Sequence, residues 1–114
     1  MKEMNERYPE ARHHALTYND PHKDHATSGK ALKKLVEDGT IQSALYYLPV
    51  QEFEHLEYDD TYPVPDDLSD EYTKSLDAYR IWEPDEGFYR IGYTSVESYF
   101  VEAGKYGESR WHRW

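Results

Sequence analysis

Hydrophobic positions in this chain follow a helical period in some segments and a strand-like pattern in others. Apolar residues recur at helical spacing between Ser28, a residue type that caps helix N-termini, and Gly39, a type that ends helices. This pattern predicts a helix near residues 29–38. The following run, residues 40–48, is rich in strand-forming residues and stops at Pro49, so we expect a strand there and a short helix after the proline.

A second helix is predicted near residues 70–79. Ser69 suits its N-cap, and Tyr72 and Leu76 belong to one apolar stripe. The preceding stretch, residues 59–67, contains two prolines and four aspartates, which disfavour regular strand pairing. We therefore expect an acidic loop before this helix.

A β-hairpin is predicted over residues 79–93, because two aromatic and β-branched runs flank a four-residue turn that starts with Pro and ends with Gly. Thr94 and Glu97 then have the spacing of a capping box. They predict a helix over residues 95–103 that ends at Gly104. The last eight residues form either a final strand or a loose end.

These elements predict an α+β fold: a small single domain with about three helices and a C-terminal β-hairpin in an antiparallel sheet. Residues 1–27 form a polar, His-rich N-terminal segment whose order stays open, with one short strand over residues 14–18, and residues 28–114 form the α+β domain. If Phe100 is buried, its replacement by Ala should cost about 3–5 kcal/mol. The residues expected in the core are Leu32, Leu35, Ile41, Leu45, Leu76, Ile81, Ile91, Val96 and Phe100.

The composition leaves room for an alternative without a fold. Leu, Val, Ile and Phe together make up only 19 of 114 residues, which, with the high net charge, is typical of disordered chains. Twelve Tyr and three Trp favour a fold, because each can bury a large area and keep a polar group for water. We expect a folded domain with an aromatic core.

Charge is unevenly distributed. The net charge is −10, but residues 35–102 carry three basic and seventeen acidic side chains, a net −14, whereas each flanking segment is +2. Such a field repels nucleic acid and anionic membranes and attracts basic surfaces. There is no cysteine, no apolar leader and no apolar run long enough to span a membrane, so we expect a soluble, cytoplasmic protein.

Histidines in the N-terminal segment provide one candidate for chemistry. His22 and His25 are three residues apart beside Asp24, a spacing that could hold a divalent metal on one helical face. A metal-dependent enzyme is therefore one alternative function. Carboxylates that are neighbours in sequence favour no acid–base pair, since both members are solvated and ionised. We expect no catalytic residues, no bound metal and no cofactor.

The segment from Ala31 to Ile41, followed by a strand-like run, resembles the recognition helix and first wing strand of winged-helix DNA-binding domains. The resemblance implies a small DNA-binding regulator that contacts phosphates through Lys30, Lys33 and Lys34. This is the second alternative function.

The leading hypothesis is an acidic interaction domain that binds a basic, nucleic-acid-binding protein and inhibits it, with no direct contact to nucleic acid or membrane. In type the chain resembles small acidic phage and mobile-element proteins that block restriction or CRISPR effectors by imitating nucleic acid. Tyrosines support an interface, because they are enriched in interfaces. Dimerisation through exposed aromatic side chains stays open. The residues expected to contact the partner are Glu52, Glu54, Glu57, Asp59, Asp60, Asp66, Asp67, Asp70, Glu71, Asp85, Glu86, Tyr58, Tyr62 and Tyr72.

Overall fold

The chain forms two compact units in a computed structural model that describes every residue from 1 to 114. The sheet unit comprises Met1–Thr61 and Ser109–Trp114, and the acidic unit comprises Tyr62–Glu108. The boundary falls within two strands, β3 and β6.

A four-stranded sheet in the order β1-β2-β6-β3 organises the sheet unit. β1 and β2 are parallel, and β2 pairs antiparallel with β6, with Tyr46 opposite His112 and Tyr47 opposite Trp111. The α+β class is confirmed, although the sheet is mixed. The elements that contribute to this unit are α1 (Lys2–Arg7), β1 (His13–Leu16), α2 (Lys23–Glu37), β2 (Ala44–Tyr47), η1 (Val50–Glu52), β3 (Asp60–Pro63) and β6 (Glu108–His112).

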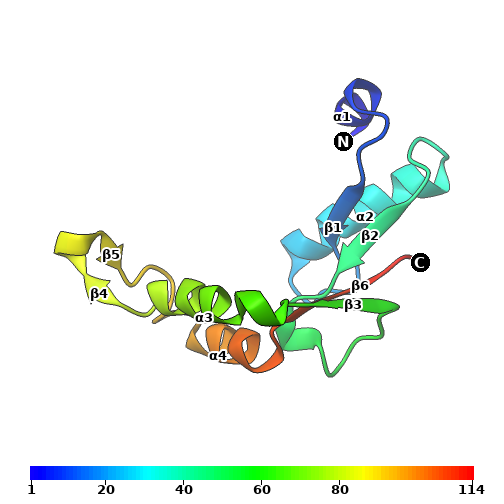
Figure 1. The fold of residues 1–114 in the computed structure, drawn as a ribbon. Coiled ribbons are helices and arrows are strands. Elements are labelled where there is room, and N and C mark those ends of the chain that lie inside the picture. The colour runs from blue at the N-terminus through cyan, green and yellow to red at the C-terminus, as the bar shows by residue number, and fades with distance from the viewer. The chain divides into compact units, whose positions relative to one another are not determined.

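Helix α2 covers one face of this sheet, where it packs on β1 and β2 (Figure 1). Leu32 of α2 is completely buried with Ile41, Ala44 and Tyr46. Gly29 permits the close approach: a Cβ there would lie 2.5 Å from the backbone nitrogen of Tyr18. The connection between parallel strands β1 and β2 is therefore a helical crossover.

Helix α2 begins at Lys23, two turns before the predicted start, and Ser28 lies within it, so the predicted N-cap is wrong. The reason is Asp20, which lies two residues before the N-cap His22. Its Oδ1 accepts the backbone N–H of His22 at 2.8 Å, and this hydrogen bond supports the first turn of the helix. Residues 1–27 consequently supply α1, β1 and the first turn of α2.

The acidic segment that was expected to exclude pairing contains β3, so that prediction is wrong. β3 is an edge strand, where a proline such as Pro63 is tolerated because one side of the strand has no partner. The C-terminal residues form β6, which lies between β2 and β3 in the sheet. Tertiary pairing, rather than local sequence, places both strands.

The acidic unit contains two helices and a separate two-stranded hairpin. The helix predicted near residues 70–79 is confirmed within one residue, and the hairpin is confirmed, with Gly87 at φ 86° closing its turn. The hairpin is not part of the four-stranded sheet. Its elements are η2 (Asp66–Leu68), α3 (Ser69–Ala78), β4 (Trp82–Glu83), η3 (Pro84–Glu86), β5 (Phe88–Tyr89) and α4 (Glu97–Tyr106).

Helix α4 differs from the prediction at both ends. It begins at Glu97 without a side-chain cap from Thr94, and it continues through Gly104. It ends at Gly107, which has φ 57°. A glycine terminates a helix when the backbone turns left-handed, and Gly107 rather than Gly104 makes that turn.

Burial is concentrated in the sheet unit. Leu32 and Ile41 are buried as predicted, but Ile91 is 72% exposed and the other six expected core residues are only half-buried. Phe100 is half-buried, so the premise of the large predicted cost of Phe100→Ala is wrong. No helix is long and apolar enough to cross a membrane. The buried residues that the sequence did not indicate are Thr17, Asp20, Ala26, Gly29, Ala44, Tyr46, Leu48, Phe53 and His112.

Candidate protein-interaction surface

The acidic unit has no buried residue, and it exposes many large apolar side chains. Forty-seven residues are too few to bury much surface on their own. Large exposed apolar surfaces are a feature of interaction sites, so this unit is the candidate surface. The large apolar side chains that are 46–72% exposed in this unit are those of Tyr62, Leu68, Tyr79, Trp82, Tyr89, Ile91, Tyr99 and Val101.

Helices α3 and α4 run antiparallel beside each other (Figure 1). The hydroxyl of Tyr72 donates to the backbone oxygen of Ala103 at 2.7 Å, and the ring centres of Tyr79 and Phe100 are 4.9 Å apart. Burial raises the pKa of Tyr72, so its hydroxyl stays a donor at neutral pH. These two contacts hold the helix pair at both of its ends.

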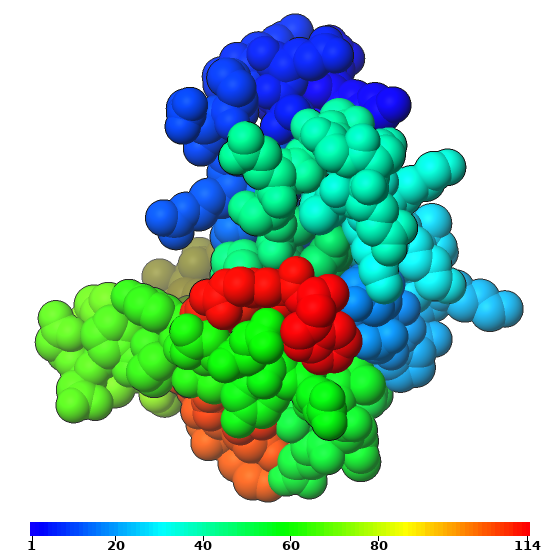
Figure 2. All heavy atoms as spheres, turned by 90° about the vertical axis from the view of Figure 1, so that its right-hand side faces the viewer, coloured from blue at the N-terminus to red at the C-terminus, as the bar shows by residue number.

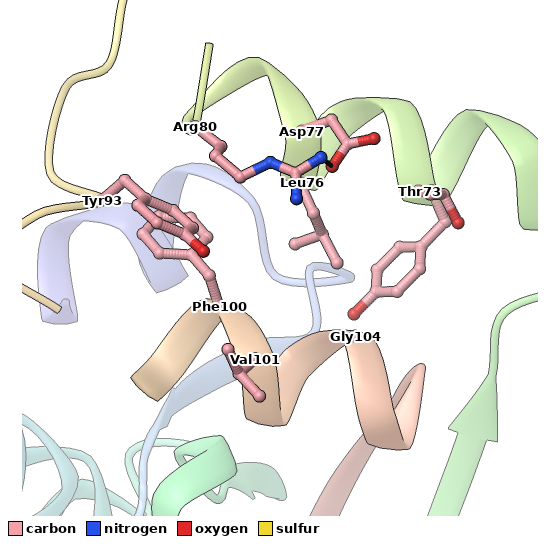
Figure 3. Close-up of a pocket in the computed structure, with 9 residues that line it drawn as sticks. Thr73, Leu76, Asp77, Arg80, Tyr93, Phe100, Val101 and Gly104 are labelled. Carbon is pink, nitrogen blue, oxygen red and sulfur yellow. Dashed lines mark ion pairs between the residues drawn. The ribbon is translucent and has the colours of Figure 1, made fainter. Parts of the chain in front are cut away.

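A groove of about 260 Å³ lies between the two helices. Figure 3 shows Leu76 pointing from α3 towards α4, with Phe100 and Val101 on the opposite wall. Arg80 lies at the rim, where its guanidinium forms an ion pair of 2.8 Å with Asp77. The floor of the groove is therefore apolar and its rim is charged.

The acidic unit carries eleven acidic and four basic residues, a net charge of −7, whereas the sheet unit carries twelve and nine, a net −3. Most of the net negative charge thus belongs to the unit that has no buried residue. Six predicted contact residues of this unit are exposed and form no ion pair: Asp66, Asp67, Asp70, Glu71, Asp85 and Glu86.

Those six carboxylates form two groups in the structure. Asp66, Asp67, Asp70 and Glu71 lie in η2 and the first turn of α3, where the helix dipole stabilises negative charge. Asp85 and Glu86 form the second group, at the hairpin tip. They are so far along the chain from the first group that the sequence did not place the two groups together. Of the predicted tyrosines, Tyr62 is 64% exposed, whereas Tyr72 is half-buried between the helices.

Three predicted contact residues of the sheet unit, Tyr58, Asp59 and Asp60, contact arginines of that unit. Asp59 accepts the backbone N–H of Arg113 at 2.6 Å, and Asp60 lies 4.0 Å from the Arg113 guanidinium. The guanidinium of Arg110 lies 4.7 Å from the centre of the Tyr58 ring. Glu54 and Glu57 are exposed, and Glu52 is half-buried. Much of this part of the acidic tract therefore has a structural role.

His112 and Thr17 form the one buried pair with the composition of a base and a nucleophile. Nδ1 of His112 lies 3.0 Å from the carbonyl oxygen of Trp114 and donates to it, so Nε2 accepts the Thr17 hydroxyl at 2.7 Å. Both residues are at most 1% exposed. Burial lowers the pKa of His112 and keeps the ring neutral. A substrate cannot reach the hydroxyl, so the pair supports the fold.

Of the N-terminal histidines, His22 and His25 form hydrogen bonds with Asp20. Nδ1 of His25 lies 3.0 Å from Asp20 Oδ2, and the rings of His22 and His25 stack with their centres 4.2 Å apart. No group of three or more His, Asp or Glu side chains is arranged to hold a metal ion. In this structure Asp20 links the start of α2 to the imidazole of His25.

The lysines of the winged-helix resemblance lie on α2. Lys33 Nζ lies 4.2 Å from the centre of the Tyr18 ring, while Lys30 and Lys34 are exposed. Upstream of α2 the chain forms α1 and the strand β1, whereas a winged helix requires two helices there. The local resemblance therefore does not extend to the fold.

No protein family, curated protein or solved structure was found to match this chain. The geometry and charge of the acidic unit are therefore the basis for a functional proposal.

Proposed function

We propose that this protein is a non-enzymatic interaction protein whose acidic unit binds a basic partner protein. One observation carries the proposal: the unit that holds −7 of the net charge is also the unit without a buried residue. Binding would satisfy both features, because Lys and Arg of the partner would pair with free carboxylates and the contact would cover exposed aromatic side chains.

The mechanism is occlusion. Long-range attraction accelerates the encounter with a basic groove, and at physiological salt it acts over about 8 Å. Carboxylates on ordered helix and hairpin ends then occupy positions that nucleic-acid phosphates would otherwise take. We propose on this basis an inhibitor of a nucleic-acid-binding effector in the cytoplasm, acting as a nucleic-acid mimic of the phage or mobile-element type.

The test measures association rates with a basic nucleic-acid-binding protein captured at low salt and then purified. A variant that neutralises the start of α3 (Asp66→Asn, Asp67→Asn, Asp70→Asn and Glu71→Gln) should associate at least about tenfold more slowly. A matched variant neutralises four carboxylates of the sheet unit (Glu3→Gln, Glu6→Gln, Glu10→Gln and Asp24→Asn) and should associate at nearly the unmodified rate. Equal losses in both variants would show that only net charge matters.

A gel-shift assay separates this proposal from a DNA-binding regulator. The protein alone should not shift duplex DNA at physiological salt, and it should release DNA from its basic partner. A shift by the protein alone, lost when Lys30 and Lys34 are replaced by Gln, would contradict the proposal.

A further inference from the structure

The groove between α3 and α4 combines an apolar floor with a strongly acidic surrounding unit. We propose that this groove is the anchor site of the interface: it takes one large apolar side chain of the basic partner, flanked in the partner by Lys or Arg. This inference rests on the proposed function and adds the element that gives the contact its specificity.

The size of the groove favours a side chain over a small molecule. Its volume of about 260 Å³ is below the roughly 300–1,000 Å³ of drug-sized ligand sites. Leu76, Phe100 and Val101 supply apolar walls, and Val101 is 58% exposed. Gly104 adds no side chain to the floor, which leaves room for the anchor.

Charge around the groove favours a basic flank. Asp70 and Asp77 are seven residues apart on α3, so they lie on the same helix face as Thr73, which lines the groove. Glu97 lies one turn before Val101 on α4. Arg80 offsets only Asp77. A second copy of this chain would bring another net −7 against the same surface, which disfavours self-association.

The test uses two synthetic peptides of equal charge as probes. One is Lys-Arg-Lys-Trp-Lys-Arg-Lys, and the other has Ala in place of the central Trp. The full-length protein should bind the Trp peptide at least about tenfold more tightly than the Ala peptide, the loss typical of an anchor side chain. Both affinities should fall by the same factor as salt rises. The ratio of the two affinities therefore reports the contribution of the groove without that of the charges.

Gly104→Leu is the plugging variant. A Cβ at Gly104 would meet only Leu76 Cδ1, at 3.6 Å, and a Gly to Leu change within a helix raises helix propensity, so α4 should fold at least as well. The affinity ratio should fall from about tenfold to less than about twofold. Thr73→Leu plugs the groove from α3 and should act in the same way. Ser98→Leu adds the same side chain elsewhere on α4 and should leave the ratio unchanged.

The possible results separate the two proposals. Equal affinity for both peptides, or a tenfold ratio that survives both plugging variants, would overturn the groove assignment and leave the electrostatic function standing. Absence of binding by either peptide at low salt would overturn both. A concentration-dependent dimer in sedimentation that Gly104→Leu dissociates would assign the groove to a second copy and so reject a basic anchor.

Discussion

Nε2 of His112 lies 2.7 Å from Oγ1 of Thr17, although the two residues are 95 positions apart in the chain. This hydrogen bond joins the end of β6 to the residue that follows β1, and the Thr17 oxygen also accepts the backbone N–H of Asn19 at 3.2 Å. Tyr18 adds a second tie to the C-terminus by donating to the Trp114 backbone oxygen at 2.5 Å. Figure 2 shows the C-terminal residues, in red, next to blue residues of the N-terminal part of the chain.

Thr17→Val should destabilise the sheet unit by about 1–3 kcal/mol. Valine keeps the shape of the side chain but leaves Nε2 of His112 buried without a donor. Urea denaturation of the full chain measures the loss. The control is Thr27→Val, an exposed position on α2, which should change the free energy of unfolding by less than about 0.5 kcal/mol. Equal effects at both positions would contradict a special role for Thr17.

The sheet unit should lose stability as the pH falls below about 6.5, the usual pKa of histidine. Burial lowers the folded-state pKa of His112, so in this window the unfolded chain binds a proton that the folded protein does not. The free energy of unfolding is therefore highest above about pH 6.5, where the ring is neutral in both states, and it falls as the pH drops below that value. An NMR titration of the His112 ring should show a midpoint below the usual histidine value of about 6.5. A His112 midpoint at or above about 6.5 would refute this.

Gly29→Ala should destabilise the protein by more than 2 kcal/mol. The added methyl group would lie 2.5 Å from the Tyr18 nitrogen and 2.9 Å from the Thr17 carbonyl carbon, so α2 would have to move away from the backbone after β1. Thermal unfolding followed by circular dichroism measures the effect. Ser28→Ala, one residue earlier and exposed, should be neutral or slightly stabilising because Ala favours helices. A neutral Gly29→Ala would disprove the close approach.

Substitutions of a buried and a half-buried apolar residue should differ in cost. Leu32→Ala removes a completely buried side chain and should cost about 2–5 kcal/mol, whereas Phe100→Ala removes a half-buried ring and should cost less than the 3–5 kcal/mol typical of a buried phenylalanine. Native-state hydrogen exchange measures both losses. For each variant, the protection of amides in the unit that holds the substituted residue is compared with that in the unmodified protein. A larger loss for Phe100→Ala would mean that the acidic unit has a core of its own.

Local signals predicted the elements that depend on neighbouring residues. The stripe in α3 and the Pro-to-Gly turn before β5 need only contacts within a few residues, and both were found where the sequence indicated. The start of α2 was missed because its support comes from Asp20, two residues ahead of the N-cap, and the end of α4 was missed because Gly104 and Gly107 differ only in backbone conformation.

The candidate surface was predicted in part. The unpaired carboxylates of α3 and the hairpin tip were named from charge alone. The groove was not, because its walls come from two helices about twenty-five residues apart and its floor depends on a glycine inside α4. The contacts of Asp59 and Asp60 with Arg113 were not predicted either, because they depend on the pairing of strands far apart in the sequence.

The sequence by itself determined the charge of this protein, its mixed secondary structure and the low supply of aliphatic side chains, since these follow from residue type and short-range spacing. Only the tertiary structure decided which apolar residues are buried. A strand such as β6 becomes central, and His112 becomes part of the core, through hydrogen bonds to segments more than sixty residues away. Such pairings gain their free energy from partners that no local pattern specifies.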